Sequence, residues 1–407
     1  MKKLILTLSL LTLIINISYS QLGWYPQNSG TVQALKGVSF YNFNNGIVVG
    51  YFDTILRTTN GGINWATSPL PNNHYYEGVT FIDNNNIMVV GHEGIIIKTT
   101  NGGLNWISQS SGTTSDLFGV FFIDENIGTV VGDSGTILKT TNSGTSWALK
   151  IIGTVNSLQG VLFINANTGT VVGENGTILR TTNVGTNWFF QSSGTTNDLY
   201  DVFFADANNG LVFGQNGTIL RTINGGTNWF SLPNVTTYTL HSVSFTDAYN
   251  GTVVGENGTI LRTINGGTSW TLQSSGTTND LFSVSFTNAN TGTVVGENGT
   301  ILRTKNGGGV FVHQINSEIP EGYSLYQNYP NPFNPSTNIR FDLHKSSRTK
   351  LIVYDILGRE VAMLVNEKLS AGSYDVDWNG NSYPSGVYFY KLLTDKYINV
   401  KKMVLIK

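Results

Sequence analysis

The chain has 407 residues, a formal net charge of −2 and no cysteine, and charged residues make up only 12% of it. The near-neutral charge argues against nucleic-acid binding, because domains that bind nucleic acids usually carry a basic face. The absence of cysteine excludes disulfides and cysteine-ligated metals. A content of 47 glycines with so few charges is typical of a β-rich protein with many tight turns.

The first twenty residues have the parts of a secretory signal peptide. Lys2 and Lys3 precede an apolar run from Leu4 to Ile17, and a small-x-small site ends at Ser20. The run is too short to span a bilayer comfortably, so we expect cleavage between Ser20 and Gln21 rather than an uncleaved anchor. No other stretch is long and apolar enough to cross a membrane, so the mature chain is expected to have no transmembrane segment.

Residues 21–312 are organised as a repeat of 41 residues. Each copy contains four short strand patterns separated by turns rich in glycine and asparagine, which is the size of one propeller blade. The sequence therefore predicts an all-β fold with a seven-bladed β-propeller, in which large tryptophans fill the space between neighbouring sheets. The repeat tryptophans are Trp24, Trp65, Trp106, Trp147, Trp188, Trp229 and Trp270.

The last blade lacks a clear fourth strand of its own. Trp24 opens an isolated strand pattern at the other end of the repeats, so we expect residues 24–27 to complete this blade beside residues 300–304. The alternative is that residues 309–313 complete it. Within each blade, pairs such as Asn298-Gly299 predict a type I′ hairpin, because both central residues of that turn need positive φ.

The turn before each tryptophan resembles the Asp-box. The family pattern is Ser/Thr-x-Asp-x-Gly-x-Thr-Trp, and Thr222–Trp229 follows it with asparagine in place of aspartate. The full repeat, with Val-Val-Gly, Gly-Thr-Ile-Leu-Arg-Thr and Asn-Gly-Gly-x-x-Trp, is most similar to the Ycf48-like (Asp-box/BNR-type) propellers. This resemblance covers about residues 24–311 and implies a propeller related to an assembly factor of photosystem II.

The periodicity stops after residue 312. Residues 313–322 have the composition of a linker, and residues 323–407 alternate in short strands that predict a small C-terminal β-sandwich. Tyr329–Pro335 (YPNPFNP), Val353–Val361 (VYDILGREV) and the lysine-rich end closely resemble the type A C-terminal sorting domain of the type IX secretion system. The resemblance implies delivery through the periplasm to the cell surface or medium of a Bacteroidota-like bacterium. Its implied partners are the type IX machinery and its sortase.

One repeat position is always basic. A ring of cations could contact an acidic partner or glycan, or each cation could pair within its own blade with a nearby acid or with turn carbonyls. The series is Arg57, Lys98, Lys139, Arg180, Arg221, Arg262 and Arg303. A matching polar series follows the Val-Val-Gly, and a carboxylate pair in it could act as acid and base. That series is Tyr51, His92, Asp133, Glu174, Gln215, Glu256 and Glu297.

Departures from the repeat are where specificity is expected. The loops at residues 69–78 and 233–241 differ from the common Gln-Ser-Ser-Gly-Thr-Thr-x-Asp-Leu, and they carry Tyr75, Tyr76 and Tyr238. Exposed aromatics on one face could stack on a sugar or a peptide, although ordinary loop packing would also explain them.

The sequence favours a non-enzymatic, exported propeller that binds an unknown protein or glycan at or outside the cell surface. A divergent sialidase-like glycoside hydrolase or lyase is one alternative, but every arginine before residue 310 occupies the regular repeat position instead of converging on a carboxylate site. A Ycf48-like assembly factor is the other. No catalytic residue, metal site or cofactor is expected, because histidines lack ligand spacing and no phosphate or dinucleotide motif occurs.

Overall fold

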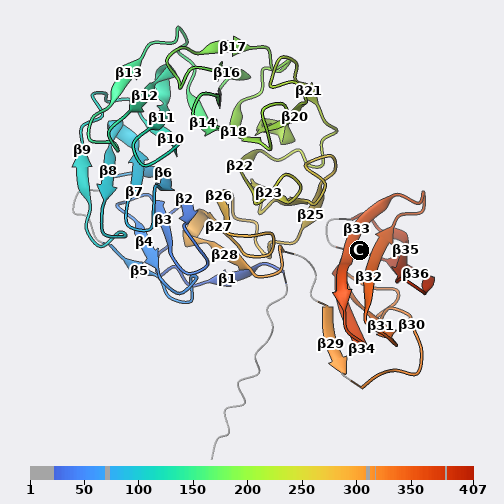
Figure 1. Ribbon diagram of the computed structural model, residues 1–407. Helices are drawn as coiled ribbons and strands as arrows, with labels where there is room; N and C mark the ends of the chain where they lie inside the picture. The colour runs from blue at the N-terminus through green and yellow to red at the C-terminus, as the bar shows by residue number, and fades with distance from the viewer. Residues whose placement is uncertain (1–22, 69–73, 309–311, 317, 381–382) are drawn as a thin grey trace, which may run out of the picture.

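The computed structural model describes residues 23–68, 74–308, 312–316, 318–380 and 383–407. Seven four-stranded sheets in these residues form a ring, and two more form a separate domain beside it (Figure 1). The fold is the all-β, seven-bladed propeller with a small C-terminal β-sandwich that the repeat period predicts. The expected signal peptide and its cleavage site at Ser20 and Gln21 lie outside the described residues.

The first strand of each blade lies nearest the centre of the ring, where it contacts the first strands of both neighbouring blades (Figure 1). Its register with the second strand shifts by one residue in every blade, which is a β-bulge. For blades 1 to 7 in order, these strands are β2 (Leu35–Phe40), β6 (Tyr76–Phe81), β10 (Leu117–Phe122), β14 (Leu158–Phe163), β18 (Leu199–Phe204), β22 (Leu240–Phe245) and β26 (Leu281–Phe286).

The second strand of each blade is buried at every position, because the sheets of adjacent blades cover both of its faces. These strands are β3 (Gly46–Gly50), β7 (Ile87–Gly91), β11 (Gly128–Gly132), β15 (Gly169–Gly173), β19 (Gly210–Gly214), β23 (Gly251–Gly255) and β27 (Gly292–Gly296). The third strands are β4 (Ile55–Thr58), β8 (Ile96–Thr99), β12 (Ile137–Thr140), β16 (Thr177–Thr181), β20 (Ile219–Thr222), β24 (Ile260–Thr263) and β28 (Ile301–Thr304).

The outer strands are only two or three residues long, which limits the exposed edge of each sheet. They are β5 (Ala66–Thr67), β9 (Ile107–Gln109), β13 (Ala148–Lys150), β17 (Phe189–Gln191), β21 (Phe230–Ser231), β25 (Thr271–Gln273) and β1 (Tyr25–Gln27). The tryptophan before each outer strand packs between sheets. Trp270, for example, lies with Phe213 of blade 5 and Val253 of blade 6 in one buried cluster.

The N-terminal strand closes the ring. β1 pairs antiparallel with β28, with Tyr25 opposite Arg303 and Gln27 opposite Ile301. Trp24 is buried and packs edge-to-face on Phe286 of the same blade, with ring centroids 5.7 Å apart. The first of the two expected closures is therefore confirmed, and blade 7 consists of β26, β27, β28 and β1.

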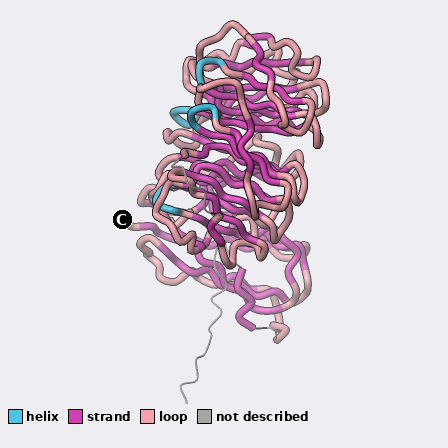
Figure 2. The backbone as a smooth tube through the Cα atoms, turned by 90° about the vertical axis from the view of Figure 1, so that its left-hand side faces the viewer, coloured by secondary structure: helices cyan, strands magenta, loops and turns pink. Residues whose placement is uncertain are grey.

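The turns between second and third strands all lie on one face of the ring. Figure 2 shows the short 3-10 turns that mark four of them gathered along one side of the propeller. These are η1 (His92–Gly94), η2 (Asp133–Gly135), η3 (Gln215–Gly217) and η4 (Glu297–Gly299). We call this side the hairpin face. The opposite side carries the Asp-box turns and is called the box face.

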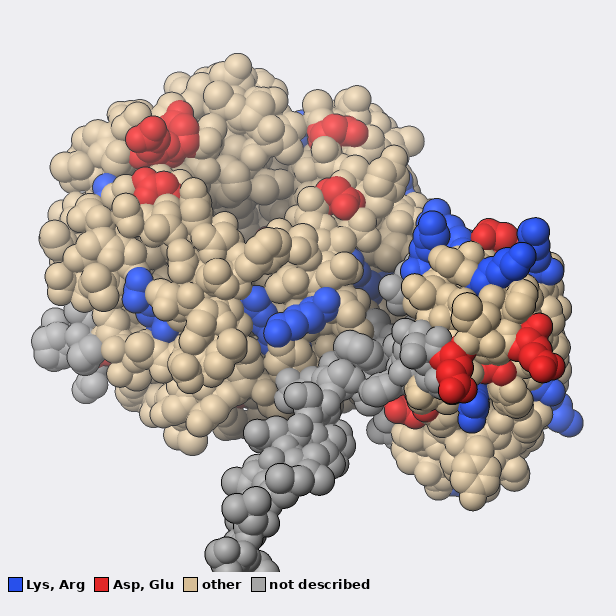
Figure 3. Space-filling model, turned by 60° about the horizontal axis from the view of Figure 1, so that its bottom comes forward, with Lys and Arg blue, Asp and Glu red and all other residues tan. Residues whose placement is uncertain are grey.

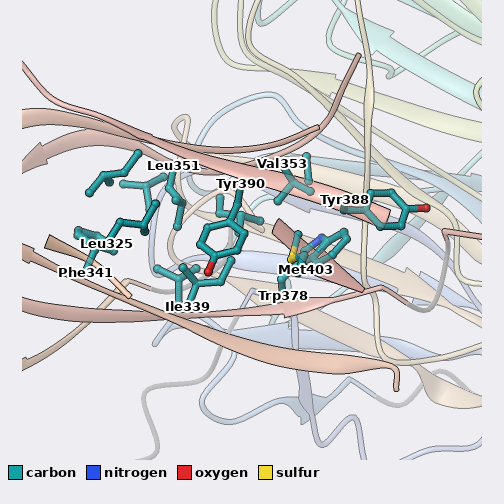
Figure 4. Close-up of a cluster of buried hydrophobic side chains, with 14 of the residues drawn as sticks. Leu325, Ile339, Phe341, Leu351, Val353, Trp378, Tyr388, Tyr390 and Met403 are labelled. Atoms are coloured by element: carbon teal, nitrogen blue, oxygen red, sulfur yellow. The ribbon is translucent and has the colours of Figure 1, made fainter. Parts of the chain in front are cut away.

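The C-terminal domain is a sandwich of two four-stranded sheets, in the orders β29-β34-β31-β30 and β33-β32-β35-β36. The buried side chains of the two sheets interdigitate, and Tyr390, Trp378 and Met403 lie near the centre of that core (Figure 4). The strands are β29 (Val312–Asn316), β30 (Ser324–Leu325), β31 (Ser336–Leu343), β32 (Ser347–Tyr354), β33 (Glu360–Leu369), β34 (Gly372–Asn379), β35 (Gly386–Leu393) and β36 (Ile398–Leu405).

The expected linker at residues 313–322 is not wholly a linker. Its first residues belong to β29, which pairs with β34 of the sandwich, with Val312 opposite Val376 and Asn316 opposite Ser373. The loss of the 41-residue period is the one signal in the sequence at this point. A single edge strand is too short to show a period of its own, so the sequence pattern does not reveal β29.

Candidate functional site

The basic series does not form an open stripe. Each cation extends from the third strand of its blade to a polar group of the next blade, and Arg180, Arg262 and Arg303 also donate to a threonine hydroxyl of their own blade, so part of the pairing lies within the blade as expected. In the described residues none of the seven forms an ion pair. The donor-acceptor pairs are Arg57 with Gly102 O, Lys98 with Ser143 O, Lys139 with Val184 O, Arg180 with Ala207 O, Arg221 with Thr268 Oγ1, Arg262 with Ala289 O and Arg303 with Phe43 O.

The burial of these cations supports a structural role in which they link neighbouring blades. Only 3% of Arg303 is exposed, and its guanidinium stacks 4.7 Å from the ring centroid of Phe40 in blade 1. Desolvation lowers the pKa of Arg262 to about 10. Because a half-buried cation that already donates to a carbonyl presents little free charge, the series is poorly placed to recognise an acidic partner.

Charge is sparse on the propeller surface seen in Figure 3, where most side chains are neither acidic nor basic. Acidic side chains lie on both sides of a central hollow, and the basic ones are few and lie away from that hollow. A groove of about 660 Å³ lies at the seam between blades 7 and 1, with Tyr25, Arg303 and Lys305 among its lining residues. No continuous basic patch appears on this face.

The polar series after Val-Val-Gly occupies the first position of the type I′ turns. In blade 7, Asn298 and Gly299 have φ of 52° and 67°, as the Asn-Gly pair predicts. Glu297 Oε2 accepts the amide of Asp280 at 3.3 Å, and Glu256 accepts the amide of Thr239 at 2.9 Å. The glutamates of blades 4, 6 and 7 thus fix the preceding loop to the turn, which is a structural role.

Blade 1 breaks this rule on the same face. Its turn places Phe52 and Asp53 at φ of 56° each, a conformation that non-glycine residues other than asparagine and aspartate rarely adopt. Asp53 Oδ1 accepts the backbone amide of His74 at 3.0 Å and the hydroxyl of Tyr76 at 3.3 Å. The turn is therefore held by side-chain contacts to blade 2, and half of the Phe52 side chain stays exposed.

The three candidate tyrosines have different environments. Tyr76 is fully buried, so the expectation that it is an exposed aromatic is wrong. It stands 41 residues after Leu35 and 41 before Leu117, and it fills the same buried position as those leucines. Tyr75 is half-buried on the hairpin face, and Tyr238 is 43% exposed in the loop before β22.

Glu77 is the centre of a polar and aromatic cluster beside Tyr75. Its Oε1 accepts the Tyr51 hydroxyl at 2.9 Å and lies 2.9 Å from His92 Nε2, and its Oε2 lies 3.8 Å from Lys36 Nζ. The hydrogen bond to Glu77 raises the pKa of His92, with nearby Asp116 adding to the effect. Burial and the Glu77 carboxylate raise the pKa of Tyr51.

The aromatic rings of this cluster face one another. Tyr75 lies 4.9 Å from Tyr51, 5.1 Å from Phe52 and 5.5 Å from His92, measured between ring centroids. His92 Nδ1 is 3.4 Å from Asp116 Oδ2. Residues of three blades therefore meet here, and we call Phe52, Tyr75, His92 and Asp116 the blade 1–3 patch.

The sequence interpretation missed a further ring of variable residues at the bulge of the innermost strands. The flanking positions repeat closely, but the bulge residue changes from blade to blade. These residues are Lys36, Glu77, Phe118, Gln159, Tyr200, His241 and Phe282. Aligning the seven copies at the 41-residue step would have shown the variation.

Several neighbours in this ring touch across blade boundaries. Tyr200 and His241 lie 5.3 Å apart, and His241 and Phe282 lie 5.6 Å apart. The Lys36 ammonium sits 3.8 Å from the Phe282 centroid. The bulge residues thus form a continuous arc that ends at Glu77 and the blade 1–3 patch.

The described part of the chain contains no group of three or more histidine, aspartate or glutamate side chains arranged to hold a metal ion. Within the same residues, no helix has the length and apolarity needed to cross a bilayer.

Comparison with protein families assigns both domains. Residues 17–158, 108–192, 188–273 and 227–321 match the model described as photosynthesis system II assembly factor YCF48. The chain belongs to the YCF48 family. Residues 327–407 match the secretion system C-terminal sorting domain. No curated protein sequence matches this YCF48-family chain.

Solved structures agree with the propeller fold. A structure described as YCF48 bound to D1 peptide is 19% identical with a TM-score of 0.60, covering 69% of this chain and 96% of that chain. YCF48 from Cyanidioschyzon merolae is 20% identical with a TM-score of 0.58, covering 69% and 98%. The WD40 propeller domain of Doa1 is 11% identical with a TM-score of 0.59, covering 70% and 96%. At these identities the likeness concerns the fold alone.

Proposed function

We propose that this YCF48-family propeller is exported by the type IX secretion system and binds a protein or glycan at or outside the cell surface. The sorting-domain match at residues 327–407 supports export in a Bacteroidota-like bacterium and recognition by the type IX machinery and its sortase. The family is named for an assembly factor of photosystem II, and one YCF48 structure contains a bound D1 peptide. A binding role for this propeller fits that kinship.

The blade 1–3 patch is the observation that carries the binding proposal. Blade 1 places Phe52 in a left-handed turn where the other blades have asparagine, serine or glutamate, and the exposed ring lies beside Tyr75. Backbone strain of this kind persists when neighbouring contacts hold it, and it is concentrated at binding and active sites. The patch is therefore the best candidate for the contact surface.

A non-enzymatic role is supported by the placement of the charged groups. A sialidase-like site needs several arginines around one substrate carboxylate, but each basic residue of the series donates at a different blade boundary. The glutamates of the turns accept backbone amides, which favours a structural role over acid-base chemistry.

Binding is tested by screening the full chain on glycan and surface-protein arrays, then repeating the screen with F52A/Y75A. The matched control is F189A/F190A, which removes two exposed aromatics from the outer strand of blade 4. We expect a ligand that the wild type and the control retain and that F52A/Y75A loses. A ligand held equally by all three proteins, or turnover of a glycan, would contradict the proposal.

Export is tested separately by deleting residues 323–407 and following the protein at the cell surface and in the medium. The truncated chain is expected to remain in the periplasm. Its appearance outside the cell at wild-type levels would remove the role assigned to the sorting domain.

A further inference from the structure

We infer that the blade 1–3 patch binds the side chain of a lysine or arginine in a basic segment of a partner protein. This inference rests on the proposed binding function and names the chemistry of its ligand. It depends on three observations. A lysine of the chain already lies in the inner half of the cluster, the outer half contains no lysine or arginine, and the hairpin face around it is rich in carboxylates.

Lys36 shows that the inner half of the cluster, which is formed by Tyr51, Glu77 and Phe282, accommodates a cation. Its ammonium lies 3.8 Å from the Phe282 centroid, 5.4 Å from the Tyr51 centroid and 3.8 Å from Glu77 Oε2. Aromatic faces attract ammonium and guanidinium groups electrostatically, and a nearby carboxylate adds to the attraction. The chain has thus placed one of its own cations between two rings and an acid.

The outer half has the same composition but no cation of its own. Phe52 and Tyr75 supply the rings, and Asp116 supplies a carboxylate whose side chain is 36% exposed. In the described residues, Asp116 forms no ion pair with a lysine or arginine, and its one charge partner is His92. An alkylammonium or guanidinium entering from solvent would meet the environment that Lys36 meets deeper in the cluster.

The charge of the hairpin face complements a basic partner. Its turns and adjoining loops carry many carboxylates, whereas the lysines and arginines that the described strands place at this end of the blades are Lys36 on the innermost strand of blade 1 and Lys150 at the end of the outer strand of blade 3. Complementary potentials of this kind speed association and select partners. The acidic residues are Asp53, Glu77, Glu93, Asp116, Asp133, Glu174, Asp198, Glu256, Asp280 and Glu297.

His92 makes the interaction sensitive to pH. It faces Glu77 from β6 and Asp116 from the loop before β10, with Lys36 from β2 and the rings of Tyr51 and Tyr75 around it. Its pKa is raised, so it becomes protonated as the pH falls through a value above the ordinary one. A protonated His92 neutralises the carboxylates that the ligand needs, and binding is expected to weaken at acidic pH.

The test uses the full chain and a fluorescent Gly-Ser peptide that contains three arginines. The matched probe carries citrulline, which is neutral and of similar shape, at the same positions. We expect the arginine peptide to bind, with an affinity that falls as salt is raised, and the citrulline peptide to bind at least about fivefold more weakly.

Variants identify the surface that binds. D116N, F52A and Y75A are each expected to weaken binding of the arginine peptide by about fivefold or more, and F189A is expected to leave it unchanged. H92Q is expected to remove the loss of affinity between pH 8 and pH 5.5, measured relative to the affinity of the same variant at pH 8. Circular dichroism and thermal unfolding check that each variant is folded.

Equal binding of the two peptides, or no effect of D116N and Y75A, would overturn the inference. Capture of a neutral glycan that depends on Phe52 and Tyr75 would also overturn it, yet would leave the proposed binding function standing. Absence of any ligand that depends on these two residues would contradict both.

Discussion

The hairpins of blade 1 and blade 7 have similar φ angles, but different types of residue adopt them. In blade 7, Asn298 and Gly299 adopt positive φ at little cost, as residues suited to a type I′ turn. In blade 1, Phe52 and Asp53 adopt nearly the same φ angles, although phenylalanine rarely does so and aspartate tolerates them less readily than glycine. The comparison shows that contacts with the adjacent blade can hold the turn. The turn residues of one blade can therefore be chosen for binding instead of for their turn-forming tendency.

The neighbours differ between the two blades. A Cβ added to Gly299 would stand 2.0 Å from the carbonyl oxygen of Thr31, so blade 7 has no room for a side chain there. In blade 1 the side chain of Asp53 is accommodated and bonds to the His74 amide and the Tyr76 hydroxyl. In blade 1 these side-chain hydrogen bonds stabilise the turn, whereas in the other blades glycine adopts the required positive φ without strain.

The largest effect is expected when the blade 1 residue is placed in blade 7. G299D should destabilise the protein by about 3 kcal/mol or more, because it combines left-handed strain with a close contact to backbone. Chemical denaturation of the full chain, following the propeller transition, measures this. N298D is the control at the adjacent exposed position and should change stability by less than about 1 kcal/mol. If G299D did not lower the free energy of unfolding, the loop at Thr31 would have to move easily to make room for the new side chain.

The reverse exchange should have a smaller effect. D53G relieves the left-handed strain but removes the acceptor of the His74 amide and the Tyr76 hydroxyl, so we expect a net loss of about 1–2 kcal/mol. The same denaturation experiment measures it. Because glycine is the better residue for this turn in isolation, a stabilised D53G would show that the side-chain bonds contribute nothing. Y76F, which removes one of the bonds, is expected to cost about 1 kcal/mol.

The smallest effect on stability is expected at Phe52. F52N restores the asparagine of the other hairpins and should stabilise the protein by about 0.5–1 kcal/mol, since asparagine tolerates positive φ. The same variant should lose the ligand that the blade 1–3 patch binds. Thermal unfolding and binding measured on one preparation test the trade-off, and a variant that gains stability and keeps full binding would separate strain from function.

The fold could be predicted from the sequence because it depends on repetition. The 41-residue step of the tryptophans fixes the number of blades, and the Asn-Gly pairs fix the type of hairpin. Closure by β1 was also predictable, since Trp24 stands one step before Trp65. β29 was not, because a five-residue edge strand has no partner within its own part of the sequence.

The candidate site was predictable only in part. The irregular loop pointed to Tyr75, but the same loop suggested an exposed Tyr76 that the 41-residue step places at a buried leucine position. Glu77, His92 and Lys36 come from different blades, so their convergence depends on how the first strands approach one another. The reach of each cation into the next blade likewise depends on the twist of the sheets, which the sequence pattern does not specify.

The pairing of β29 with β34 has a consequence for how the sorting domain leaves the propeller. Glu318, Ile319, Glu321 and Gly322, which follow β29, are exposed, so a protease could reach this stretch. A cut there would sever the covalent connection and leave β29 bonded along the edge of the sandwich. The two domains would then separate only when the hydrogen bonds between β29 and β34 break, and the propeller would keep β29 as a short unpaired segment.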